Sequence, residues 1–137
     1  MKFFIPEGKR VLDLGCGIGD LLDALHPAHG VGIDISPKMI RIAQENHPKL
    51  TFVLGDLENQ ETISSLGDEP FDYIILSDTI GFLEDCQTTF QSLHKLCKND
   101  TRIILFVKFI IYIYIYIMSC IKNSITIYDE DDKLSKV

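Results

Sequence analysis

The residue types with the clearest chemical meaning lie in VLDLGCGIGD at residues 11–20 and in VGIDIS at residues 31–36. A short apolar run gives way to three glycines, and a second apolar run ends at Asp34. The order strand, glycine turn, helix, strand and acid is how a doubly wound sheet holds a nucleotide-like ligand. These stretches therefore predict a ligand site built from glycine backbone and a carboxylate.

The spacing of the glycines restricts the ligand. Gly15 and Gly17 stand where the backbone must turn and let a ligand approach, and Gly19 lets the next helix pack closely. The spacing G-x-G-x-G, followed by Asp20, does not match the dinucleotide pattern G-x-G-x-x-G. A pyrophosphate would also lie beside the Asp20 carboxylate, an unfavourable neighbour. The turn favours a ligand without phosphates, although a tight turn with no ligand would use the same glycines.

Two further acids follow the next strands. Asp34 lies 17 residues beyond Gly17, near the usual interval for an acid that binds ribose. Its two oxygens can accept hydrogen bonds from both vicinal hydroxyls, although an exposed surface acid is the alternative. Asp56 ends the third strand in the same way and could receive an adenine amino group, with the backbone of Leu57 nearby.

The elements that must position these residues alternate along the chain. Apolar runs predict strands at residues 10–14, 31–35, 50–54, 71–76 and 102–107. Helical spacing predicts helices from Asp20, from Ser36 to His47, within residues 57–70, and over Phe90, Leu93, Leu96 and Cys97 up to a turn at residues 98–100. This alternation is typical of a Rossmann-like, doubly wound parallel sheet of the α/β class.

Composition restricts the class of protein. The chain has 137 residues and a net charge of −7, with 13 basic and 20 acidic residues, so nucleic acid and anionic lipid are disfavoured as partners. The four cysteines have no C-x-x-C spacing, which predicts neither a metal site nor a disulfide framework. The first ten residues contain too few apolar residues for a signal peptide. We expect a cytoplasmic protein.

The character of the sequence changes after residue 107. Residues 112–117 read YIYIYI, which a TA dinucleotide repeat would encode, and this suggests that residues 108–137 are read-through or frame-shifted sequence. The alternation suits a strand or a loosely ordered tail. Residues 103–121 also approach the length of a membrane span, but Lys108 and the central tyrosines disfavour an anchor. We divide the chain into a core at residues 1–107 and an atypical stretch at 108–137.

Several motifs together resemble one family. VLDLGCGIGD, VGIDIS, GDLEN at 55–59, FDYIILSD at 71–78 and LHKLCKNDTRIIL at 93–105 resemble the class I S-adenosylmethionine-dependent methyltransferases. The resemblance covers residues 6–107 and implies the strand order 3-2-1-4-5, with S-adenosylmethionine as cofactor and an unidentified methyl acceptor. The family continues past the fifth strand into a helix and an antiparallel hairpin. The resemblance therefore implies a truncated domain that lacks this hairpin.

The resemblance also implies roles for single residues. It places nine cofactor-binding residues near the carboxyl ends of the first four strands: Asp13, Gly15, Cys16, Gly17, Asp34, Ile35, Asp56, Leu57 and Ser77. Asp13 and the glycine turn would hold the methionine part of the cofactor, and Asp34 would accept hydrogen bonds from its ribose hydroxyls. Ile35 would pack on the adenine ring, whose edge Asp56 and Leu57 would contact.

Catalysis asks little of the protein, because the methyl group of the cofactor is already activated and the acceptor needs only to be held in line with it. Asp78 is the nearest candidate base, although a plain turn residue is the alternative. His26, His29 and His47 are expected to be solvated. The rival interpretation is a non-catalytic binding or interaction module, possibly an inactive fragment, and the glycine spacing disfavours a nicotinamide-dependent oxidoreductase.

Overall fold

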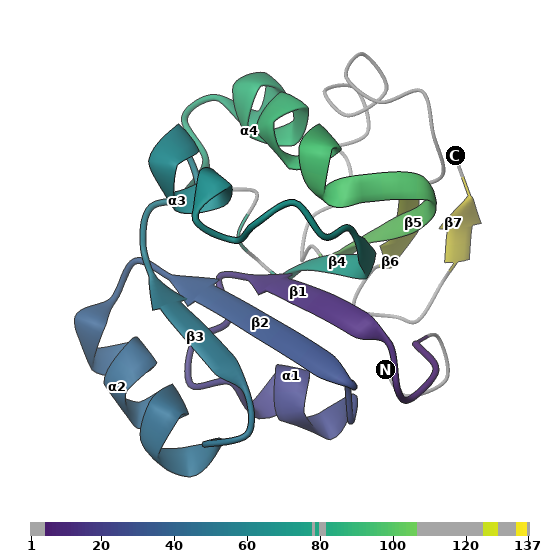
Figure 1. Cartoon of the computed structure of the whole chain (residues 1–137). Helices are drawn as coiled ribbons and strands as arrows, with labels where there is room; N and C mark the ends of the chain where they lie inside the picture. Colours follow the sequence, from purple (N-terminus) through teal and green to yellow (C-terminus); the bar gives the residue numbers. More distant parts are fainter. Residues whose placement is uncertain (1–4, 78, 80–81, 107–124, 129–133, 137) are drawn as a thin grey trace.

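A computed structural model describes residues 5–77, 79, 82–106, 125–128 and 134–136. The strands are β1 (Arg10–Leu14), β2 (His29–Asp34), β3 (Thr51–Leu54), β4 (Phe71–Ser77), β5 (Cys97–Phe106), β6 (Ile125–Tyr128) and β7 (Leu134–Lys136). The helices are α1 (Asp20–Ala24), α2 (Pro37–Asn46), α3 (Gln60–Ser64), α4 (Cys86–Leu93) and the 3₁₀ helix η2 (His94–Leu96). One sheet lies between α1 and α2 on one face and α3 and α4 on the other (Figure 1).

The first five strands form the predicted parallel sheet. The strands follow the order β3-β2-β1-β4-β5, so the predicted order 3-2-1-4-5 is confirmed. β1 pairs in parallel with both β2 and β4, and Asp13 lies opposite Gly32 on one side and Ile75 on the other. The winding direction therefore reverses between β1 and β4, which is where open α/β sheets bind their ligands.

Beyond β5 the structure differs from the expectation of a sheet without a C-terminal hairpin. β6 pairs in parallel with β5, and β7 pairs antiparallel with β6 at the edge of the sheet. The sequence ITIY at residues 125–128 is rich in β-branched residues, which suit a strand on an otherwise open edge. The YIYIYI stretch and residues 107–121 of the suggested anchor lie outside the described residues. None of the helices in the described part of the chain combines the length and hydrophobicity that a membrane span requires.

Side chains from alternate positions of β1 enter two cores. Leu12 belongs to the core under α3 and α4, whereas Val11 belongs to the core against α1 and α2. Asp13 has the same parity as Val11 and so faces the side of α1 and α2. A charged residue thus occupies a core position immediately before the glycine turn.

The predicted boundaries of α2 are confirmed. The Ser36 side chain accepts a hydrogen bond from the Met39 N–H at the start of the helix, and Pro37 occupies its first turn, where a missing N–H costs nothing. The helix ends at Asn46, before His47. Local capping signals were sufficient here because the contacts that decide the boundaries are themselves local.

The predicted boundary between the last helix and the fifth strand is wrong. Cys97 is the first residue of β5 rather than part of a helix, and the expected turn at residues 98–100 lies inside that strand. Cys97 pairs with Phe71, but the next pair in register is Arg102 with Tyr73. The extra residues form a bulge, and their polar sequence is what resembled a turn.

Candidate functional site

A cavity of about 490 Å³ opens at the carboxyl ends of β1 to β4. Its lining comes from the turns after these strands: Gly15, Asp34, Ile35, Gly55, Asp56, Leu57, Glu58, Ser77, Thr79, Phe82, Leu83 and Glu84. Six of the nine sequence-predicted cofactor residues belong to this lining. Asp13, Cys16 and Gly17 do not line the cavity, and Asp78 lies outside the described residues.

The first turn is held by its backbone N–H groups, which donate to β2, and by a residue that follows β4. The N–H groups of Gly15 and Cys16 both donate to the Ile33 carbonyl, at 2.8 and 2.9 Å. Gly15 has a φ of 78°, and a β-carbon on it would overlap the Thr79 hydroxyl. That hydroxyl donates to the Leu14 carbonyl at 2.9 Å. Thr79 therefore ties the end of β4 to the glycine turn, a role that the sequence analysis missed.

Asp34 connects the glycine turn to α2. Its Oδ2 accepts the Gly17 N–H at 2.9 Å, and its Oδ1 accepts the Ser36 N–H at 2.9 Å. Each carboxylate oxygen has two lone pairs. The residue can therefore hold the turn and still accept hydrogen bonds from a ligand in the cavity that it lines.

Asp13 is the most unusual group near the site. Its side chain is 1% exposed, and Oδ1 has no hydrogen-bond partner among the described residues. Burial, and secondly the charge of Asp34, raise the pKa of the Asp13 carboxyl to about 7. An unpaired buried carboxylate is costly, so a cationic ligand group that reached it would supply a partner the protein lacks.

Cys16 has a packing role in the turn. Burial, followed by the charges of Asp13 and Asp34, raises the pKa of its thiol to about 12, so the sulfur stays protonated and is a poor nucleophile near neutral pH. The sulfur also lies against β2, because a β-carbon on Gly32 would be only 2.7 Å from it.

The rim of the cavity is acidic. Asp34, Asp56, Glu58 and Glu84 line it, and none of its described lining residues is Lys, Arg or His. Asp56 Oδ1 accepts the Glu58 N–H at 2.9 Å, and Glu58 Oε1 accepts the Asp85 N–H at 2.6 Å. A phosphate group would meet uncompensated negative charge here. The arrangement favours a neutral or cationic ligand.

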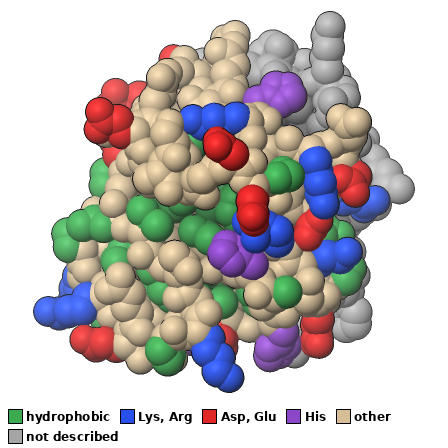
Figure 2. All heavy atoms as spheres, viewed as in Figure 1, with side chains coloured by type: hydrophobic (Ala, Val, Ile, Leu, Met, Phe, Trp, Pro, Cys, Tyr) green, Lys and Arg blue, Asp and Glu red, His purple; other side chains and the backbone are tan. Residues whose placement is uncertain are grey.

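Four apolar side chains form another part of the cavity wall. Ile35 is 70% exposed and Phe82 is 85% exposed, and both line the cavity together with Leu57 and Leu83. Figure 2 shows hydrophobic side chains at the surface in a central band between the two layers of helices. Exposed apolar side chains beside a few polar groups are typical of a site for a partly planar, apolar ligand. Phe82 was missed because it follows the fourth strand in a segment without periodicity.

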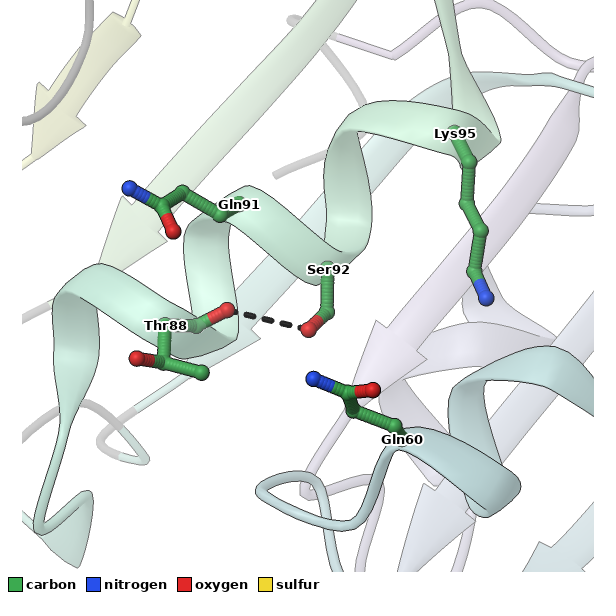
Figure 3. A pocket seen from close by; sticks show the side chains of 5 residues that line it. All are labelled: Gln60, Thr88, Gln91, Ser92 and Lys95. Carbon is green, nitrogen blue, oxygen red and sulfur yellow. Dashed lines mark hydrogen bonds between the residues drawn. The ribbon is translucent and has the colours of Figure 1, made fainter.

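A second, smaller hollow of about 250 Å³ lies between α3 and α4, lined by Gln60, Thr88, Gln91, Ser92 and Lys95 (Figure 3). Ser92 donates to the Thr88 carbonyl, and Lys95 donates to the Ser64 hydroxyl at 2.7 Å. This hollow shares no lining residue with the larger cavity, which remains the candidate site.

His47 does not fit the expectation of a solvated histidine. Its side chain is 14% exposed and lies against the carboxylates of Asp20 and Asp23. The prediction failed because these residues belong to a different helix, and nothing in the local sequence around His47 indicates that contact.

Comparison with known proteins agrees with this geometry. Residues 5–107 match the family model described as a methyltransferase domain. A phosphoethanolamine N-methyltransferase of Zea mays is 31% identical over 107 residues, which are 76% of this chain and 21% of that protein. A phthiotriol/phenolphthiotriol dimycocerosates methyltransferase of Mycobacterium leprae is 42% identical over 75 residues, which are 50% of this chain and 26% of that protein. The chain therefore spans about a quarter or less of the length of these curated relatives.

Solved structures share the fold. A TehB-like methyltransferase from Corynebacterium glutamicum has a TM-score of 0.67 and 23% identity, covering 83% of this chain and 65% of that one. An S-adenosylmethionine-dependent methyltransferase from Mesorhizobium loti has a TM-score of 0.60 and 27% identity, covering 69% of this chain and 44% of that one.

Proposed function

Because the chain belongs to the class I S-adenosylmethionine-dependent methyltransferases, we propose that it binds S-adenosylmethionine at the carboxyl ends of β1 to β4 and transfers the methyl group to an acceptor. The observation that carries this proposal is the cavity at the switch point of the sheet, which gathers the glycine turn, Asp34 and Asp56. We propose residues 1–107 as the cofactor-binding core, and from the atypical stretch at residues 108–137 the strands β6 and β7 extend its sheet.

The residues present suit this cofactor. It has no phosphate and it carries a sulfonium and an ammonium group, which agrees with an acidic rim without cations. Asp34 would accept the ribose hydroxyls, and Asp13, with its unpartnered oxygen, would pair with the ammonium group. Ile35 and Leu57 would pack on the adenine ring, and Asp56 would accept a hydrogen bond from the adenine amino group. Gly15, Cys16 and Gly17 would contribute backbone.

When bound, S-adenosylmethionine supplies a methyl group activated by its sulfonium sulfur. The work of the chain is then to bind and orient the two reactants, since orientation can supply most of the acceleration. Ser77, which lines the cavity, would face the sulfonium side. We propose Asp78 as the group that takes a proton from the acceptor.

We propose the cytoplasm as the compartment, because the widely spaced cysteines suit a reducing environment. The net charge of −7 supports a small-molecule acceptor over a nucleic acid.

Calorimetric titration tests the cofactor directly. We expect S-adenosylmethionine to bind and NAD to produce no heat. Asp34→Ala should abolish binding because it removes both the ribose acceptor and the hydrogen bond to Gly17. Asp68→Ala, at an exposed acid away from the cavity, is the matched control and should bind normally. Binding of NAD, or of neither ligand, would contradict the proposal.

A further inference from the structure

His47 lies next to Gly19, the third glycine of the turn. It follows α2, and its N–H donates to the Ala43 carbonyl at 2.9 Å. The ring is mostly buried and lies next to the ring of Phe52 on β3, with centroids 6.5 Å apart. This histidine is therefore fixed in place by its own helix end and by the neighbouring strand.

Both nitrogens of the ring face carboxylates of α1. Nε2 lies 2.8 Å from Asp20 Oδ1, and Nδ1 lies 3.5 Å from Asp23 Oδ1. The contact with Asp20 is a hydrogen bond, and Asp23 lies at ion-pair distance from the other nitrogen. The ring therefore bridges two acids in the first turn of α1. Among the described residues, these two carboxylates are the charged groups paired with the ring.

The same ring contacts the turn that shapes the cofactor cavity. Gly19, which immediately precedes α1, has a φ of 83°, and a β-carbon on it would lie 2.6 Å from Phe52 and 3.2 Å from His47. The third glycine is therefore pressed against these two rings. The preceding part of the turn is tied to Asp34 through the Gly17 N–H. His47 is thus connected, through the turn from Gly19 to Gly17, to Asp34, which lines the cavity.

We propose that His47 is a positioning residue that clamps α1 through Asp20 and Asp23 and holds the glycine turn in the shape that the cofactor binds. This inference rests on the proposed function. Without these contacts the first turn of α1 loosens and cofactor affinity falls. His47 itself does not line the cavity.

The test compares His47→Phe with the unchanged chain by calorimetric titration of S-adenosylmethionine. Phenylalanine keeps a ring against Phe52 and Gly19 but cannot hydrogen-bond to Asp20 or pair with Asp23. We expect the variant to bind about tenfold more weakly, because α1 loses both contacts. The double variant His47→Phe with Asp20→Ala should lose no more than the larger of the two single losses, because the contact is broken only once.

His94→Phe, at an exposed histidine on η2, is the control and should leave the affinity unchanged. An unchanged affinity of His47→Phe, or losses that add in the double variant, would overturn the inference and assign His47 a packing role only. If His47→Phe does not fold, Asp20→Ala alone carries the test, with the same loss expected and an unchanged affinity again contrary. Failure of the unchanged chain to bind S-adenosylmethionine would instead overturn the proposed function.

Discussion

At the amino ends of β1, β4 and β5, Glu69 and Asp72 are paired with cations, whereas the acids that line the cavity at the carboxyl ends of β1 to β4 have no cation beside them in that lining. Asp72 accepts the Arg10 N–H at 2.9 Å and pairs with Lys98 at 2.5 Å. The Arg10 side chain pairs with Glu69 at 3.0 Å and lies over the Phe71 ring. In contrast, none of the described residues that line the cavity is a cation.

The pKa shifts follow this division. The hydrogen bond from Lys98, followed by that from the Arg10 backbone, lowers the pKa of Asp72. Burial and the charge of Asp34 raise the pKa of Asp13 to about 7. A fold can neutralise its charges, as it does at the amino ends, so unbalanced charge at the other end indicates a place kept for a ligand. The predictions below test whether the two ends differ in this way.

The largest expected effect is on Asp13. Its pKa is higher in the folded chain than the unfolded value of 3.8, so the folded state holds the proton more tightly. Stability should therefore be highest at low pH and should fall between about pH 4 and about pH 7, by at most about 4 kcal/mol. Above about pH 7 this loss is complete. Asp13→Asn should remove the fall, as measured by urea unfolding across this pH range.

Asp13→Asn should at the same time weaken cofactor binding, because the neutral amide no longer attracts the ammonium group. A variant that is more stable at pH 8 but binds more weakly is the signature of a group kept for a ligand. Asp68→Asn, at an exposed position, is the control for both measurements. If Asp13→Asn lowered stability at pH 8, the Asp13 carboxylate would stabilise the fold itself, and the idea that it is kept for a ligand would be wrong.

The next effect concerns how tightly the glycine turn is packed. Gly19→Ala should cost about 2–4 kcal/mol, because the φ of 83° is strained for alanine and its β-carbon meets Phe52. Gly67→Ala is a matched control, since Gly67 has a φ of 84° and no atom within 4 Å of the added carbon. That control should cost about 1–2 kcal/mol. Equal costs in urea unfolding would show that the contact with Phe52 carries no energy.

The features that the sequence could predict depend on local contacts, whereas those that it missed depend on contacts between distant segments. The first five strands, α2 and the acid at Asp34 follow from hydrophobic periodicity, capping residues and spacing, all of which act over a few residues. Thr79 reaches the Leu14 carbonyl across 65 positions, and His47 reaches Asp20 across 27. Such contacts form only when the sheet brings the segments together, and a single sequence carries no local signal for them. The bulge in β5 was missed because its polar residues resemble those of a turn.

The smallest effect is expected at the paired end of the sheet. Asp72→Ala removes the partner of Lys98 and the acceptor of the Arg10 N–H, but this cluster is partly exposed, so the cost should be about 1 kcal/mol. Because the pKa of Asp72 is lowered, its contribution is present at neutral pH and is lost as the pH falls through the folded pKa. The difference in urea unfolding between the two proteins should therefore vanish in acid. Cofactor affinity should not change. An affinity loss comparable to that of Asp13→Asn would mean that the two ends of the sheet are coupled, and the contrast between a structural end and a ligand-binding end would not hold.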